Sequence, residues 1–165
     1  MATANRLTDV LTRQVAVLQE LQQVLQQEQK AIVGLDTAEM ELLNSRKEEL
    51  LNRQRTVADT LRQAMTETAA ELRLPGSATL TEIIDAMPAS AKAQVQPLQQ
   101  SARQTGSSVS IVAGQNRRML EQFLGVVNDS LGFILRILNT SNTYGVRGTY
   151  LPNHQAGAVM VSKEA

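Results

Sequence analysis

The chain has 165 residues, the length of one ordinary domain, and its 16 basic and 16 acidic residues give a net charge of zero. This balance argues against a protein whose main task is to bind nucleic acid or an anionic membrane surface, because both tasks need a basic excess. Cysteine is absent and the single histidine is His154, which excludes disulfides, cysteine-ligated zinc and a thiol nucleophile, and argues against a metal enzyme.

The N-terminus is polar and lacks the apolar segment of a signal peptide. The most apolar stretch of the chain, Met119 to Leu138, contains Glu121, Asp129 and Arg136. Charges of this kind are unfavourable at the centre of a bilayer. We therefore expect a soluble, cytoplasmic protein that does not insert into membranes.

The first predicted helix covers about residues 5–33. The composition is rich in good helix formers such as Leu, Gln, Ala, Glu and Arg. A pair of neighbouring apolar residues recurs every seven residues as Val10-Leu11, Val17-Leu18, Val24-Leu25 and Ala31-Ile32. This heptad pattern predicts a helix with a wide apolar face that contacts two neighbours. Gly34 is predicted to end the helix as its left-handed C′ residue.

The second and third predicted helices, over about residues 37–73 and 80–87, each begin with a capping-box pattern. In this pattern an N-cap side chain and an acidic side chain three residues later satisfy each other's backbone N–H groups. The short turn before the second helix predicts an antiparallel hairpin with the first. Pro75-Gly76 separates the second helix from the third. The two capping pairs are Asp36 with Glu39 and Thr79 with Glu82.

The last predicted helix covers about residues 91–139, and Pro97 either kinks it or stands in its first turn. An apolar seam with alternating steps of four and three is expected to bury this helix in a bundle. Asn116 in the seam either fixes the register, as buried Asn does in coiled coils, or lies at a bundle edge. The members of the seam are Leu98, Ala102, Thr105, Val109, Val112, Asn116, Met119, Phe123, Val126, Ser130, Phe133 and Ile137.

These elements predict an all-α fold. We expect an antiparallel helical bundle or coiled coil of three long helices plus one short helix over residues 1–139, and a flexible C-terminal tail over residues 140–165. The sequence shows no phosphate-binding loop, nucleophile elbow or paired acid site. We therefore predict that the chain is not an enzyme and has no cofactor and no metal.

A second apolar stripe occurs only in the last third of the final helix. Together with the seam it makes an apolar arc of roughly 200°, which is wider than one neighbouring helix needs. Two interpretations remain open. Either the first two helices cover the arc within the monomer, or a partner does, which is a second copy or an apolar helix of another protein. The members of the second stripe are Leu120, Leu124, Val127, Leu131, Ile134 and Leu138.

The order of these features resembles the FlgN family, which are cytoplasmic chaperones of the bacterial flagellar export system. The resemblance covers roughly Leu7 to Gly148 and includes AEMELLNSRKEELL in the second helix. Its most specific part is NRRMLEQFLGVVNDSLGFILRILNTSNTYGVRG, from Asn116 to Gly148, where an Asn opens an apolar helix. That stretch ends in a Tyr-x-x-x-Gly motif, here Tyr144 to Gly148.

The resemblance implies a chaperone that binds the C-terminal helical region of the hook-filament junction proteins FlgK and FlgL. Such a chaperone prevents premature assembly of these clients and delivers them to the flagellar type III export gate. The resemblance also implies that the stripe from Leu120 to Leu138 is the client-binding surface. It implies that Tyr144 and Gly148 dock on the export gate protein FlhA, although Tyr144 has an alternative role as a local anchor against the end of the bundle.

The alternative function is a self-associating structural coiled-coil protein without a role in secretion. Both interpretations rest on the same apolar arc, and they are compatible with each other. A client surface that is empty attracts a second copy, so we expect a homo-oligomer when the client is absent.

Overall fold

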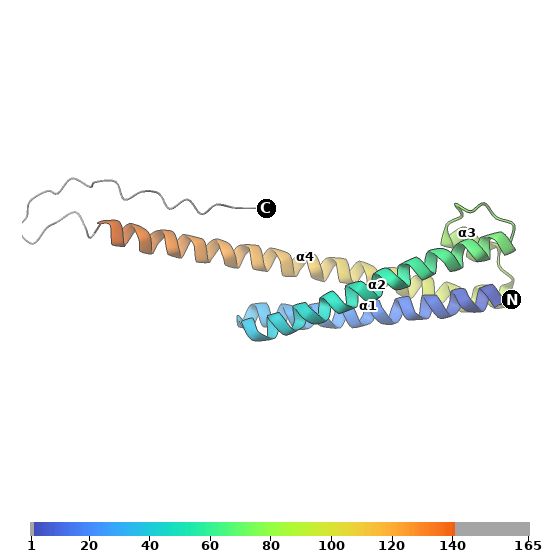
Figure 1. Cartoon of the computed structure of the whole chain (residues 1–165), viewed down its shortest axis with the longest axis horizontal. Coiled ribbons are helices and arrows are strands. Elements are labelled where there is room, and N and C mark those ends of the chain that lie inside the picture. The colour runs from blue at the N-terminus through green and yellow to red at the C-terminus, as the bar shows by residue number, and fades with distance from the viewer. Residues whose placement is uncertain (1, 141–165) are drawn as a thin grey trace, which may run out of the picture. The chain divides into compact units, whose positions relative to one another are not determined.

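The structure is a computed structural model that describes residues 2–140, and the regular elements in this range are helices (Figure 1). The predicted all-α class is therefore confirmed for the described part of the chain. The chain divides into two compact units, Met1–Leu120 and Glu121–Ala165, and the last helix contributes to both. The helices are α1 (Ala2–Gly34), α2 (Thr37–Glu71), α3 (Leu80–Ala86) and α4 (Ala89–Thr140).

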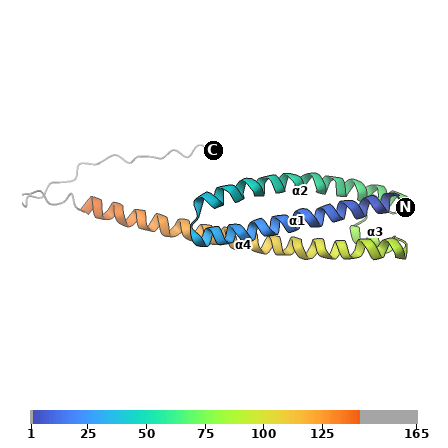
Figure 2. The same cartoon turned by 90° about the horizontal axis from the view of Figure 1, so that it is seen from below.

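Helices α1 and α2 form an antiparallel hairpin in the first unit, and both views show them side by side (Figures 1 and 2). The salt bridges between them give the register, because the residue number on α2 falls as the number on α1 rises. These bridges are Arg6–Glu67, Glu20–Arg53 and Glu28–Lys47.

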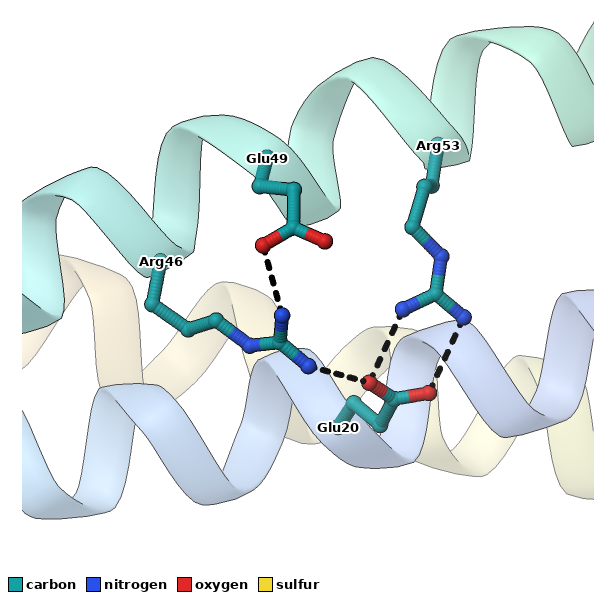
Figure 3. Close-up of polar contacts among 4 residues, drawn as sticks. All are labelled: Glu20, Arg46, Glu49 and Arg53. Atoms are coloured by element: carbon teal, nitrogen blue, oxygen red, sulfur yellow. Dashed lines mark hydrogen bonds and ion pairs between the residues drawn. The ribbon is translucent and has the colours of Figure 1, made fainter.

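Glu20 lies at the centre of the most extensive of these ionic contacts (Figure 3). Its carboxylate accepts two bonds from the Arg53 guanidinium, at 3.0 and 3.1 Å, and one from Arg46 at 3.1 Å. Arg46 also donates to Glu49 on its own helix at 2.6 Å. The bond from Arg53, assisted by the charges of Arg53 and Arg46, lowers the pKa of Glu20 below its ordinary value. The network fixes the hairpin register, while its exposure to water keeps its contribution to stability modest.

The end of α1 is a Schellman motif in which Leu35 takes the left-handed conformation, with φ of 53°. Its N–H bonds to the Ile32 carbonyl at 3.2 Å, and the Asp36 N–H bonds to the Ala31 carbonyl at 2.9 Å. The prediction that Gly34 is the left-handed residue is therefore wrong by one position, because the helix continues through Gly34.

The two predicted capping boxes have different outcomes. Thr79 and Glu82 form both arms of the box at the start of α3. At the start of α2, the Asp36 side chain accepts from the Glu39 N–H at 3.0 Å. The Asp36 N–H is already used by the Ala31 carbonyl, so it is not available to a Glu39 side chain and this box has a single arm.

The first unit contains two apolar cores. One lies between the start of α1, the end of α2, α3 and the start of α4, with Leu7, Leu11, Ile83 and Val95 among its most buried side chains. The other lies between the end of α1 and the start of α2, around Leu21, Leu25, Ala31, Leu43 and Leu50, and is covered by Val109, Val112 and Ala113 of α4.

Within the first unit α4 runs in the same direction as α1. Two hydrogen bonds, Gln22 to Ser108 at 2.7 Å and Gln29 to Gln115 at 3.4 Å, join residues with the same offset of 86. With this offset Gly34, the last residue of α1, lies level with Leu120. Leu120 is also the last residue of the first unit. Pro97 lies inside α4, which excludes the alternative that it begins the helix.

Candidate functional site

The part of α4 that lies in the second unit carries large apolar side chains that are exposed to solvent. Their exposed fractions range from 37% for Val127 to 64% for Val126. The members come from both stripes, so they form one continuous surface over roughly 200° of the helix. We call this surface the apolar arc. It consists of Phe123, Leu124, Val126, Val127, Leu131, Phe133, Ile134 and Ile137.

The residues predicted to bind the client occupy several environments. Leu124, Val127, Leu131 and Ile134 are exposed on the apolar arc. Leu120 is half-buried at the end of the first unit, and Leu138 lies in α4 with its side chain outside the description. The predicted docking residues for the export gate, Tyr144 and Gly148, lie outside the described residues.

The prediction that the apolar seam buries α4 along its whole length is wrong beyond Met119. The seam members upstream are buried or half-buried, as expected. Phe123, Val126, Phe133 and Ile137 are instead 41–64% exposed. The physical reason is that these four residues lie in the second unit and belong to neither of the two apolar cores of the first, so they join the apolar arc. Leu135, 58% exposed, borders the arc and belongs to neither stripe.

The apolar arc offers almost no polar partner to a ligand. Ser130 is the polar member of its two stripes, and its hydroxyl donates to the Val126 carbonyl of the same helix at 2.8 Å. The helical positions of Asn128 and Asp129 place them on the opposite side, while Gln122 borders the arc beside Phe133. Covering the side chains of the arc would contribute on the order of 10 kcal/mol of transfer free energy. This gain offsets most of the free-energy cost of association, which is about 4–15 kcal/mol. The surface therefore suits an apolar partner, because burial of apolar side chains supplies the favourable free energy.

A buried polar junction lies just before the point where α4 leaves the first unit. Asn116, only 2% exposed, donates its amide to the Leu25 carbonyl at 2.8 Å and to the Glu28 carboxylate at 2.9 Å. Glu28 also accepts from the Lys47 ammonium at 2.5 Å. The polar junction therefore joins α1, α2 and α4, which favours the register role for Asn116 over a position at the bundle edge.

Sequence reasoning missed a small apolar patch at the tip of the α1–α2 hairpin. Val33, Leu35 and Leu42 are 57–73% exposed there. Val33 follows the last heptad pair, Ala31-Ile32, and Leu42 precedes the buried Leu43. One helical residue amounts to a rotation of about 100°, and this offset from the core positions is the signal that would have indicated their exposure.

A pocket of about 470 Å³ lies in the first unit, between the start of α1, the end of α2 and the turn from α3 to α4. Thr3, Thr8, Thr68 and Ser90 supply hydroxyls to its wall, and Glu71 is the titratable residue among those that line it. Hydroxyls beside one carboxyl do not provide the nucleophile, base and orienting group that catalysis needs. Among residues 2–140, no cluster of three His, Cys, Asp or Glu side chains is placed to hold a metal ion. In the same range, none of the helices combines the length and apolarity required to cross a bilayer.

A helical scaffold with one exposed, nearly charge-free apolar helix surface defines a class of protein that acts by binding other proteins. Comparison with protein families narrows this class. The family described as FlgN protein matches residues 1–152, and the chain belongs to the FlgN family. This is a family of flagellar export chaperones, which bind flagellar export substrates in general. No curated protein and no solved structure matches the chain.

Proposed function

We propose that this protein is a cytoplasmic export chaperone for the hook-filament junction proteins FlgK and FlgL. It binds the C-terminal helical region of its client, prevents premature assembly and delivers the client to the flagellar type III export gate. The observation that carries the proposal is the exposed apolar arc on a chain that belongs to the FlgN family.

The dimensions of the apolar arc fit an amphipathic helix. From Phe123 to Ile137 the arc extends over about 21 Å at a rise of 1.5 Å per residue, which is about four helical turns. Helix-in-groove recognition uses apolar anchors at similar spacing along the bound helix. Because the arc is wider than one helix covers, the client surrounds α4 with more than one apolar segment.

The first unit serves as the scaffold that presents α4. We infer that α1, α2 and the first half of α4 pack as a coiled coil, with the polar junction setting their register. Tyr144 and Gly148 remain our candidates for docking on FlhA, and they lie within the 1–152 range of the family match. A docking segment after the client surface would allow one chaperone to hold its client and contact the gate.

The double substitution Leu124→Asp with Leu131→Asp tests the client surface. These side chains are 59% and 53% exposed, so the variant is expected to remain folded. Burying two unpaired carboxylates against an apolar client costs at least about 2–4 kcal/mol, which weakens binding at least about thirtyfold. The assay is calorimetric titration with client C-terminal segments.

The matched control is Gly125→Asp with Gly132→Asp, which adds the same charge at the same spacing of seven residues on the opposite side of α4, where an added Cβ meets no atom within 4 Å. It should bind the client as the wild type does. A folded Leu124→Asp, Leu131→Asp variant that binds within twofold of the wild type would remove the apolar arc as the client surface.

Self-association is the second candidate function, because the exposed arc is also a surface for another copy of the chain. It predicts a stable homo-oligomer at low micromolar concentration. Sedimentation that shows monomer alone at these concentrations would remove this candidate.

A further inference from the structure

The sequence continues for 25 residues beyond Thr140. This segment contains one run of four consecutive apolar residues, Ala158-Val159-Met160-Val161, which we call the tail run. The family match ends at residue 152, so the tail run lies outside the part of the chain that matches FlgN. We propose that the tail run docks on the apolar arc of its own chain when no client is bound. As a statement about how the client site is regulated, the inference rests on the proposed function.

The chain is long enough for this contact. Eighteen residue steps separate Thr140 from Ala158 and span at most about 60 Å. The far end of the apolar arc, Phe123, lies 17 helical residues before Thr140, which is about 26 Å along the axis. Every part of the arc is thus within reach of the tail run.

The tail run has the chemistry that the apolar arc requires. Its three large aliphatic side chains carry no charge and no hydrogen-bonding group, and Ser130, the polar member of the arc's stripes, is bonded to its own helix. Methionine adapts its shape to irregular apolar surfaces. Lys163 and Glu164 follow the run, so these two charges can stay in water while the run is buried.

A tethered segment competes well with a client although it is small. Attachment to the same chain gives the tail run an effective concentration on the order of millimolar. Three side chains cannot cover the eight of the apolar arc, so a client with a longer apolar face displaces the run. If the run occupies the arc most of the time, it weakens apparent client affinity about three- to tenfold.

The test uses the absence of cysteine in the natural chain. A spin label attached through Ser162→Cys, next to the tail run, broadens methyl signals of residues that lie near it. We expect strong broadening at Leu124, Val127 and Leu131 without client, and its loss in the Val159→Asp, Val161→Asp variant. The matched control, Asn153→Asp with Gln155→Asp, adds the same charge to the tail outside the run and should keep the broadening.

Two outcomes would overturn the proposal. The first is broadening of the arc no greater than in the Val159→Asp, Val161→Asp variant. The second is equal broadening in a mixture in which the spin label and the isotope label are on different molecules, since that would make a second copy the occupant.

Client titration separates this proposal from the proposed function. We expect a C-terminal segment of FlgK or FlgL to relieve the broadening and to bind Val159→Asp, Val161→Asp about three- to tenfold more tightly than the wild type. Broadening that persists while no client binds would refute the chaperone function and leave the tail contact intact. Client binding of equal affinity to both proteins, without broadening, would refute the tail contact and leave the chaperone function intact.

Discussion

Replacing Asn116 by aspartate changes the polar junction without changing its size. In the native protein the Asn116 amide donates to the Leu25 carbonyl at 2.8 Å and to the Glu28 carboxylate at 2.9 Å. Aspartate is isosteric with asparagine but, when ionised, it donates no hydrogen bond. The substitution therefore removes both bonds and places a second negative charge beside Glu28.

The expected loss of stability is large. The bond to the Glu28 carboxylate contributes about 1.5–3 kcal/mol and the bond to the backbone carbonyl about 1 kcal/mol. The uncompensated charge on Asn116→Asp is buried, because Asn116 is only 2% exposed, and breaking a buried polar contact in this way costs about 3–5 kcal/mol in total, with the lost bonds included. Because a protein of this size has a free energy of unfolding of about 5–15 kcal/mol, we expect the variant to fold and to lose about 3–5 kcal/mol at pH 7.5.

Urea unfolding followed by circular dichroism measures the effect. Protonation of the introduced carboxylate restores a donor toward Glu28, so the difference from the wild type should shrink between pH 7.5 and pH 5. Asn128→Asp, at an exposed position of the same helix, is the control and should change stability by less than about 0.5 kcal/mol. A loss below 1 kcal/mol for Asn116→Asp at pH 7.5 would refute the role given to the polar junction.

Three further predictions concern the helices. Alanine at Gly125 or Gly132 should stabilise α4 by about 0.5–1 kcal/mol each, because an added Cβ meets no atom within 4 Å. Slower amide exchange in α4 would show the added stability, and unchanged exchange would contradict the prediction. Leu35→Gly should raise the free energy of unfolding by about 0.5–1 kcal/mol. Leu35 has a left-handed φ of 53°, which strains a residue with a Cβ but not glycine. A lower urea midpoint would count against the Schellman geometry. The bonds from the Thr79 N–H and hydroxyl lower the pKa of Glu82 from its ordinary 4.5, so its stabilisation is present above pH 4.5 and is lost as pH falls through the folded-state pKa. Carbon-13 titration should show this low pKa and a partial rise in Thr79→Ala, which keeps the backbone N–H bond. An equal pKa in both proteins would exclude the Thr79 hydroxyl as one of its causes.

The helices could be predicted from the sequence because their signals are local. The heptad pairs from Val10 to Ile32 indicate α1, and the Thr79–Glu82 pair indicates the start of α3. Such signals depend on a few neighbouring residues, so they survive without knowledge of tertiary contacts. The errors at Gly34 and Asp36 arise because local patterns treat each helix end separately. The Asp36 N–H bonds to the Ala31 carbonyl at the end of α1, so it is not available for a capping box at the start of α2.

The full apolar arc could not be predicted in this way. The stripe with Leu124 and Leu131 was identified as excess apolar surface, whereas Phe123 and Phe133 have the same period as the buried seam. Whether a seam residue is covered depends on where the neighbouring helices end. That position follows from the offset of 86 residues between α1 and α4, which is a tertiary quantity without a local sequence signal.

The most direct test of the central claim is calorimetric titration of the wild-type chain with C-terminal segments of FlgK and FlgL from the same organism. The account predicts saturable one-to-one binding with a negative change in heat capacity, because the apolar arc becomes buried. Folded protein that binds neither segment would contradict it.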